Sequence, residues 1–224
     1  MNAGVQAPNV VPVDREKWIQ ELDLSNFINT YYQYRDLKAL GCIKDVLEIG
    51  PGQGFSTIVL KARGYSVKTF DIDRTFNPDH VGSVHDMEMF MDGEFDAVIV
   101  SHVLEHIAEP FLNKALKEIA RVGKFALVYL PVAGRHCQIR ILPGFKSIDI
   151  SVVIDIYNRL HKPDGLMPRY CSRQHFWEVG YRGFRAKDVT NRVSRFFEVI
   201  GSYRNRDWNP SFNLVLKSRE SGLA

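Results

Sequence analysis

The sequence predicts an α/β protein built on a doubly wound, mostly parallel sheet. Between Val46 and Pro131, short apolar segments typical of buried strands alternate with segments of helical periodicity. The first apolar segment runs directly into a glycine-rich turn and then into a helix, an arrangement that opens the helix N-terminus to a ligand. Because crossover connections between parallel strands are right-handed, the helices are expected on both faces of the sheet.

The composition fits a single soluble globular domain over residues 1–224, with 45% hydrophobic and 25% charged residues. A net charge of +3 is too small to indicate nucleic-acid binding by itself. The three cysteines are odd in number and widely spaced, which favours a reducing, cytoplasmic location. The sequence has no secretory signal and no apolar run of about 18 residues that would span a membrane.

The chain is expected to begin with a disordered lead-in over residues 1–13, followed by helices over residues 14–40. In the second segment, large apolar residues recur at steps of three and four, and Gly41 is a natural helix stop.

The first strand, Val46–Ile49, leads into glycines at positions 50, 52 and 54. Glycine can adopt a positive φ and lets the backbone approach a ligand closely. Glu48 precedes the first of these glycines by two residues, and its carboxylate would repel a pyrophosphate but attract a cationic or hydroxyl-bearing ligand. The spacing also departs from the dinucleotide fingerprint and from the Walker loop, which disfavours a nicotinamide oxidoreductase.

Polar residues follow the next strands along the chain. Asp71 ends the second apolar segment, about 20 residues after Glu48, where an acid can accept hydrogen bonds from ribose hydroxyls. Asp73 is a weaker candidate, since it suits a helix cap equally well. Asp86 and Met87 end the segment that begins at Val81, and Ser101 ends the fourth apolar segment.

The pattern Glu-x-Gly-x-Gly-x-Gly at 48–54 and the run FDxVxxxxxLEHI at 95–107 resemble motifs of the class I S-adenosylmethionine (SAM) methyltransferases. The resemblance covers about residues 45–131. It implies a Rossmann-like, seven-stranded, mostly parallel sheet of order 3-2-1-4-5-7-6 with the last strand antiparallel. It also implies SAM as cofactor, bound by residues at the carboxyl ends of the strands: Glu48, Gly50, Gly52, Gly54, Asp71, Asp86, Met87 and Ser101.

The remaining chain completes this fold. Residues 187–195 are expected to form a helix, and residues 196–203 and 211–217 a terminal antiparallel hairpin. Residues 132–175 fit the core pattern least and are expected to form a substrate cap, with residues 14–40 as a helical lid. The many arginines after residue 158 suit an anionic or sugar-linked acceptor.

Histidine is the residue best suited to take a proton from an acceptor at neutral pH. His102, in the loop after the fourth strand, and His175 are the leading candidates for a catalytic base; His106 and His136 are weaker. His102 and His106 also stand three residues before and one residue after Glu105, a spacing that suits metal ligands on a helix. The metal-using branches of the family carry Glu where this chain has His102, so the sequence predicts no metal.

The sequence therefore predicts a SAM-dependent methyltransferase acting on a small-molecule or sugar acceptor, with a hydroxyl as the favoured target. Two alternatives stay open: an RNA 2′-O-methyltransferase, and a SAM-binding partner subunit without catalytic activity. The first would call for a basic stripe and an RNA-binding module, and neither is evident. Neither the acceptor nor the oligomeric state follows from the sequence.

Overall fold

The structure is a computed structural model that describes residues 24–141, 148–154, 175–205, 207–208 and 210–219. The predicted lead-in over residues 1–13 and the beginning of the predicted helical segment 14–40 lie outside the described residues. Among the described residues, no helix is both long and apolar enough to cross a lipid bilayer.

The protein is built on a seven-stranded sheet of order β3-β2-β1-β4-β5-β9-β8, as predicted. All neighbouring strands are parallel except β9, which runs antiparallel to both β5 and β8. The strands are β1 (Asp45–Ile49), β2 (Ser66–Asp71), β3 (His80–Val81), β4 (Phe95–Ser101), β5 (Gly123–Pro131), β8 (Phe197–Arg204) and β9 (Ser211–Ser218). β3 is shorter than the predicted segment, because the chain turns after Val81.

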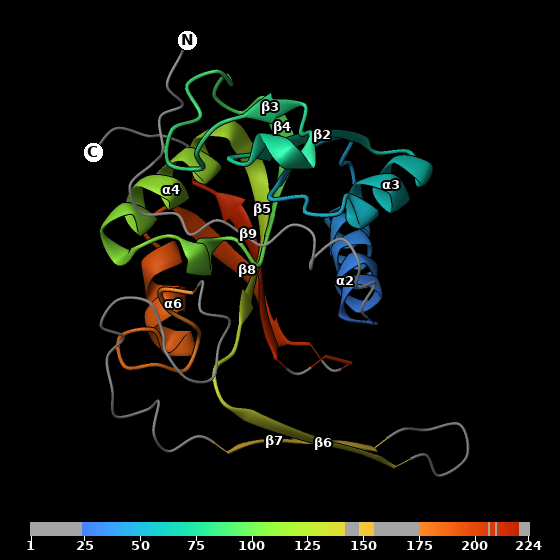
Figure 1. Cartoon of the computed structure of the whole chain (residues 1–224), viewed down its shortest axis with the longest axis vertical. Helices are drawn as coiled ribbons and strands as arrows, with labels where there is room; N and C mark the ends of the chain where they lie inside the picture. Colours follow the sequence, from blue (N-terminus) through green and yellow to red (C-terminus); the bar gives the residue numbers. More distant parts are fainter. Residues whose placement is uncertain (1–23, 142–147, 155–174, 206, 209, 220–224) are drawn as a thin grey trace.

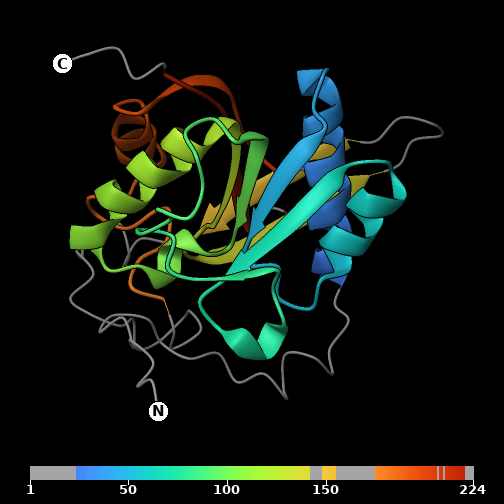
Figure 2. The same cartoon turned by 90° about the horizontal axis from the view of Figure 1, so that it is seen from above.

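Helices cover both faces of this sheet (Figures 1 and 2). α2 (Leu24–Leu40) and α3 (Phe55–Ala62) pack on one face, and α4 (Glu109–Val122) and α6 (Ala186–Val193) pack on the other. Two short 3-10 helices, η1 (Arg74–Phe76) and η2 (Leu104–His106), follow β2 and β4. Each sheet face carries its own cluster of buried apolar side chains, as expected for a doubly wound sheet.

α2 is held to the sheet by a buried carboxylate. Asp36 is 5% exposed and accepts hydrogen bonds from the hydroxyls of Tyr129 (2.7 Å) and Tyr203 (2.5 Å). At the other end of the helix, the Phe27 ring lies 4.6 Å from that of Phe55, the first residue of α3. In the described part of the predicted lid, α2 is therefore held against the sheet, and its first turn lies next to the glycine-rich turn. The function of α2 as a lid stays a prediction.

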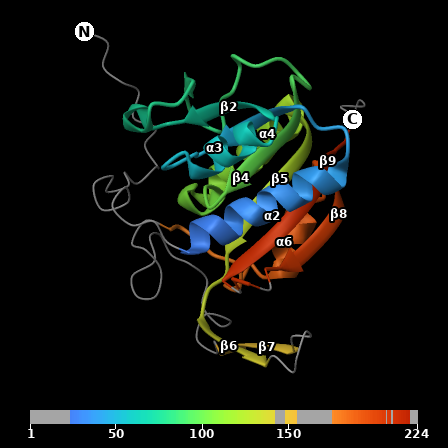
Figure 3. The ribbon, with the colours of Figure 1, turned by 90° about the vertical axis from the view of Figure 1, so that its right-hand side faces the viewer.

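The predicted cap contains a separate two-stranded antiparallel sheet. β6 (Arg135–Ile141) pairs with β7 (Ile148–Ile154), and this hairpin continues from the carboxyl end of β5. Figures 1 and 3 show it apart from the seven-stranded sheet. Residues 142–147 and 155–174 lie outside the described residues, so a cap over the acceptor stays a prediction.

Asp96 links the amino ends of β1 and β4. Its carboxylate accepts hydrogen bonds from the backbone N–H groups of Lys44 (3.0 Å) and Asp45 (3.1 Å) and from Lys124 Nζ (2.9 Å). The hydrogen bond from Lys124 and that from Asp45 lower the pKa of Asp96 from 3.8 to about 2. The charged carboxylate therefore stabilises the folded state above pH 3.8, and this contribution is lost as the pH falls through about 2.

We expect Asp96→Asn to lower the free energy of unfolding at pH 7 by about 1–2 kcal/mol, because a charged acceptor of three hydrogen bonds is lost. When urea unfolding is measured between pH 7 and pH 2, the free energy of unfolding of the Asp96→Asn variant should also fall less steeply with decreasing pH than that of the wild type. Asp92→Asn is the control, because Asp92 is 72% exposed and its ion pair with Arg121 is worth little. Equal effects of the two substitutions would contradict this assignment.

Candidate functional site

The glycine-rich turn is shaped by three left-handed backbones. Gly50, Gly52 and Gly54 have φ angles of 68°, 53° and 73°, and Gly54 is the N-cap of α3. A Cβ atom on Gly50 would overlap the side chain of Val103, which follows β4. Glycine at position 50 is therefore required by the conformation and by the approach of the neighbouring loop.

Glu48 lies inside this turn rather than on its surface. The carboxylate is 3% exposed and accepts hydrogen bonds from the hydroxyls of Ser56 and Thr57, the second and third residues of α3. Burial raises the pKa of Glu48 in spite of these hydrogen bonds. Because each Glu48 oxygen accepts a hydrogen bond from a hydroxyl of α3, Glu48 fixes α3 against β1 in this structure. Direct contact between Glu48 and the cofactor stays a prediction.

A cleft opens at the carboxyl ends of β1 and β2. Asp71, the last residue of β2, lines it; burial raises the pKa of this carboxyl, and its Oδ1 accepts a hydrogen bond from Asp73 N–H (2.9 Å). Asp73 caps η1, the alternative role that the sequence analysis gave for this weaker ribose-binding candidate. The lining residues come from β1, β2, the turn after β3 and the loop after β4: Ile49, Gly50, Phe70, Asp71, Ile72, Gly82, Ser83, Val84, Val103, His106 and Ile107.

Two of the predicted cofactor-binding residues, Asp86 and Met87, are not among the residues that line this cleft. Asp86 is exposed beside a turn closed by the Ser83–Asp86 bridge, and Met87 is a fully buried core residue. The Met87 N–H donates to Glu118 Oε2 at 3.0 Å. Ser83 and Val84 line the cleft instead. The sequence analysis did not predict them because it selected the acidic residue, Asp86, and not the turn that precedes it. Binding by Asp86 and Met87 stays a prediction.

The loop after β4 begins with a strained residue. Ser101 ends β4 half-buried and is not a cleft-lining residue, and His102 adopts a left-handed backbone with φ 55°. The His102 N–H donates to the carbonyl of Tyr129 at 2.9 Å, and its ring centroid lies 5.3 Å from that of Trp208. His102 Nδ1 lies 3.5 Å from Glu105 Oε1, and among the described residues Nε2 has no hydrogen-bond partner.

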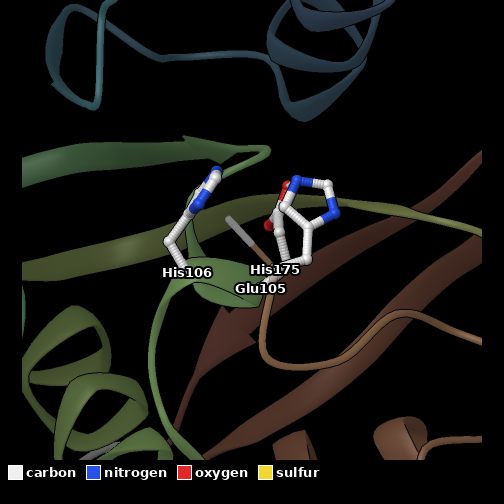
Figure 4. Close-up of side chains that lie close together, drawn as sticks. All are labelled: Glu105, His106 and His175. Atoms are coloured by element: carbon white, nitrogen blue, oxygen red, sulfur yellow. Dashed lines mark ion pairs between the residues drawn. The ribbon is translucent and has the colours of Figure 1, made fainter. Parts of the chain in front are cut away.

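Glu105 is the centre of a histidine cluster. Its side chain is fully buried, and neither carboxylate oxygen has a well-formed hydrogen bond from the described residues. His175 Nε2 lies 4.0 Å from Oε1, and the rings of His106 and His175 are 4.8 Å apart, edge to face. Figure 4 shows Glu105 and His106 on η2 and His175 on the segment that approaches it. Burial favours the neutral acid, but the surrounding imidazoles outweigh it and lower the pKa of Glu105.

His175 reaches this cluster because residues 175–179 dock along η2 and β5. The Phe176 N–H donates to the carbonyl of Glu105 (2.8 Å), and the Val179 N–H to that of Pro131 (2.9 Å). His175 Nδ1 lies 2.6 Å from Glu178 Oε1. Burial opposes the charged ring, but Glu178 and Glu105 outweigh it and raise the pKa of His175.

The structure thus brings the two predicted histidines, His102 and His175, to one buried carboxylate. His106, a weaker candidate, joins them and also lines the cleft. The side chain of His136 lies outside the described residues. A second, smaller pocket lies between α4, α6 and the sheet; its mostly apolar lining offers no comparable chemistry.

Comparison with known proteins agrees with this arrangement. Residues 47–125 match the family described as "Methyltransferase domain". No curated protein matches the sequence. Among solved structures, the PH0226 protein of Pyrococcus horikoshii OT3 is 16% identical, with a TM-score of 0.58 over 90% of this chain and 93% of that one.

Two further similar structures carry named activities. The N-methyltransferase NodS of Bradyrhizobium japonicum WM9, in complex with S-adenosylhomocysteine, is 12% identical, with a TM-score of 0.57 over 92% of this chain and 97% of that one. The glycopeptide N-methyltransferase MtfA, in complex with sinefungin, is 14% identical, with a TM-score of 0.55 over 85% of this chain and 94% of that one. At these identities the likeness establishes the fold.

We expect Gly50→Ala to weaken binding of S-adenosylhomocysteine at least about tenfold in calorimetry, because the new methyl group displaces Val103 from the cleft wall. Gly64→Ala is the matched control: Gly64 also has a positive φ, of 94°, but a Cβ there meets open space. The control should cost only the backbone strain, about 1–2 kcal/mol of stability, and leave the affinity unchanged. Unchanged affinity in folded Gly50→Ala protein would show that this turn does not shape the binding site.

Proposed function

We propose that this chain, which carries a methyltransferase domain of the class I SAM-dependent family and uses SAM as its methyl donor, methylates a hydroxyl group of a small molecule or sugar. The observation that carries the proposal is the meeting of two features: the cleft at the carboxyl edge of the sheet and the histidine cluster around Glu105. His106 belongs to both.

The cleft has the features expected of a SAM site. Gly50 lets a ligand approach the backbone at one end, and Asp71 offers a carboxylate where ribose hydroxyls bind in open α/β sheets. Apolar side chains between them, Ile72, Val84 and Ile107, suit the faces of an adenine ring.

A small-molecule acceptor is supported by the similar structures, because NodS and MtfA are named as N-methyltransferases and MtfA acts on a glycopeptide. We favour an oxygen acceptor for this chain because a hydroxyl must lose its proton on methylation, and the cluster offers a means to take it. An anionic or sugar-linked acceptor is favoured by the many arginines in the sequence after residue 158.

His102 is the favoured base. Its Nδ1 faces the buried carboxylate of Glu105, which would hold the ring with the proton on Nδ1, as in the carboxylate–imidazole pairs of many hydrolases. Nε2 is buried and has no hydrogen-bond partner among the described residues, and it is the nitrogen that would accept the proton. His175 is less suited in this structure because both its nitrogens face carboxylates, those of Glu178 and Glu105.

The reaction then balances as follows. The acceptor oxygen forms a bond to the methyl carbon of SAM while the carbon–sulfur bond breaks. The electron pair of that bond stays on sulfur and gives neutral S-adenosylhomocysteine. The acceptor proton passes to His102 Nε2 and from there to water.

The first experiment is an acceptor screen with SAM labelled in the methyl group, over sugars, sugar nucleotides, phenols and amines. We expect label in hydroxyl-bearing sugars or small molecules, in an ether linkage that mass spectrometry assigns to oxygen. Label only in amines would replace the oxygen acceptor by nitrogen. Absence of S-adenosylhomocysteine binding would remove the proposal altogether.

With an acceptor in hand, His102→Asn should lower kcat and kcat/KM together by about 10²- to 10⁴-fold while the affinity for S-adenosylhomocysteine is retained. Asparagine tolerates the left-handed backbone that His102 adopts, so the fold should survive. His80→Asn, at a histidine of β3 outside the cluster, is the control. Normal turnover of His102→Asn would leave proximity and orientation as the simpler account.

A further inference from the structure

We propose that Glu105, His106 and His175 bind a divalent transition-metal ion at the edge of the cofactor cleft, with Zn²⁺ the best-matched ion. One ligand atom from each residue, a carboxylate oxygen and two imidazole nitrogens, lies within 4.8 Å of the others. Metal ligands at about 2.0–2.2 Å from a shared ion stand roughly 3–4 Å apart, so the cluster needs to contract by about 1 Å. The cluster holds no ion in this structure.

The buried carboxylate of Glu105 points to a cation. Its side chain is fully buried, yet neither oxygen has a well-formed hydrogen bond among the described residues. A buried carboxylate without partners is costly, and the groups that face it are imidazoles. A metal ion shared with two of these imidazoles would supply the missing charge and replace the weak contacts at 3.5–4.0 Å by coordination bonds.

The way His175 is held supports the same assignment. Metal-binding histidines commonly donate their second ring N–H to a carboxylate, which fixes the ring and its tautomer. His175 Nδ1 lies 2.6 Å from Glu178 Oε1, and Glu178 is itself buried. This leaves Nε2, the nitrogen that faces Glu105, as the metal ligand.

The donor set selects the class of ion. Two imidazoles and one carboxylate suit Zn²⁺, Co²⁺, Fe²⁺ or Ni²⁺, whereas Mg²⁺ prefers ligands made up of oxygen. Three protein ligands also leave a coordination position open, as in catalytic zinc sites. This inference reverses the sequence-based prediction of no metal, which rested on His102 at the first motif position; the set found here uses His175 and does not need His102.

The position of the site suggests its use, and this step rests on the proposed function. His106 lines the cofactor cleft, so an ion held by this residue would lie beside the cleft in which the methyl donor binds. A metal-bound hydroxyl loses its proton more easily and is held in place for attack. His102 Nδ1 and His175 Nε2 both face Glu105 Oε1, so an ion bound through Oε2 would leave the contact between Oε1 and His102 in place.

The test is direct metal binding by the full-length protein after EDTA treatment and dialysis. We expect about one Zn²⁺ per chain by competition with a chromophoric chelator. Co²⁺ should give the visible absorption of an ion bound by nitrogen and oxygen, and Zn²⁺ should displace it. His106→Ala and His175→Ala should each weaken Zn²⁺ binding at least about tenfold, and His80→Ala should not change it. Thermal melts of each variant identify any that does not fold, and His175→Gln then takes the place of His175→Ala.

Failure of the wild type to bind Zn²⁺ or Co²⁺ would overturn the metal site, as would binding that is equally tight in the folded His106 and His175 variants. Calorimetry with S-adenosylhomocysteine on the same EDTA-treated protein separates this from the proposed function. Cofactor binding without metal binding removes only the metal site, and metal binding without cofactor binding removes only the proposed function. Turnover lost on chelation and restored by Zn²⁺ or Co²⁺, but not by Mg²⁺, would support the acceptor role; full turnover of the chelated enzyme would overturn it.

Discussion

The close approach of Gly50 to Val103 is the constraint on which the site depends. β1 and β4 are neighbouring parallel strands, and Ile49 at the carboxyl end of β1 is paired with Val100 near the carboxyl end of β4. The loops that follow the two strands therefore begin side by side at the same edge of the sheet. Only a residue without a Cβ allows them to touch, and only glycine adopts the φ of 68° without cost. This contact makes one cleft wall out of two segments that lie about 50 residues apart in the sequence.

Two buried glutamates follow these strands, and their surroundings differ. Each oxygen of Glu48 accepts a hydrogen bond from a hydroxyl of α3, and these bonds hold the helix N-terminus at the glycine-rich turn. Glu105 is equally buried but faces imidazoles at longer distances and has no well-formed hydrogen bond among the described residues. A polar group left in this state is common at functional sites and uncommon elsewhere, because its burial must be offset by something that binds. This difference is why the proposed base and the proposed metal site both use Glu105.

The histidine cluster is assembled from distant parts of the chain. η2 supplies Glu105 and His106, while the segment at residues 175–179 supplies His175 and docks through backbone hydrogen bonds to Glu105 and Pro131. Trp177 anchors that segment, since it is 1% exposed and its Nε1–H donates to the carbonyl of Ile107 at 3.1 Å. Backbone contacts of this kind place His175 accurately without requiring a regular element, as expected of a rigidly supported loop.

The sequence by itself determined the alternation of strands and helices, the glycine-rich turn and the acid after β2, because strand periodicity and glycine spacing are local signals. The sheet order followed from the resemblance of its motifs to those of the class I methyltransferases, and the structure confirmed it. The sequence also singled out His102 and His175 one at a time. The tertiary structure decided that the two meet at Glu105, that Ser83 and Val84 line the cleft where Asp86 and Met87 were expected, and that Glu48 points into its own turn. These outcomes depend on which side chain is buried and what lies across from it, and that depends on contacts between segments far apart in the chain.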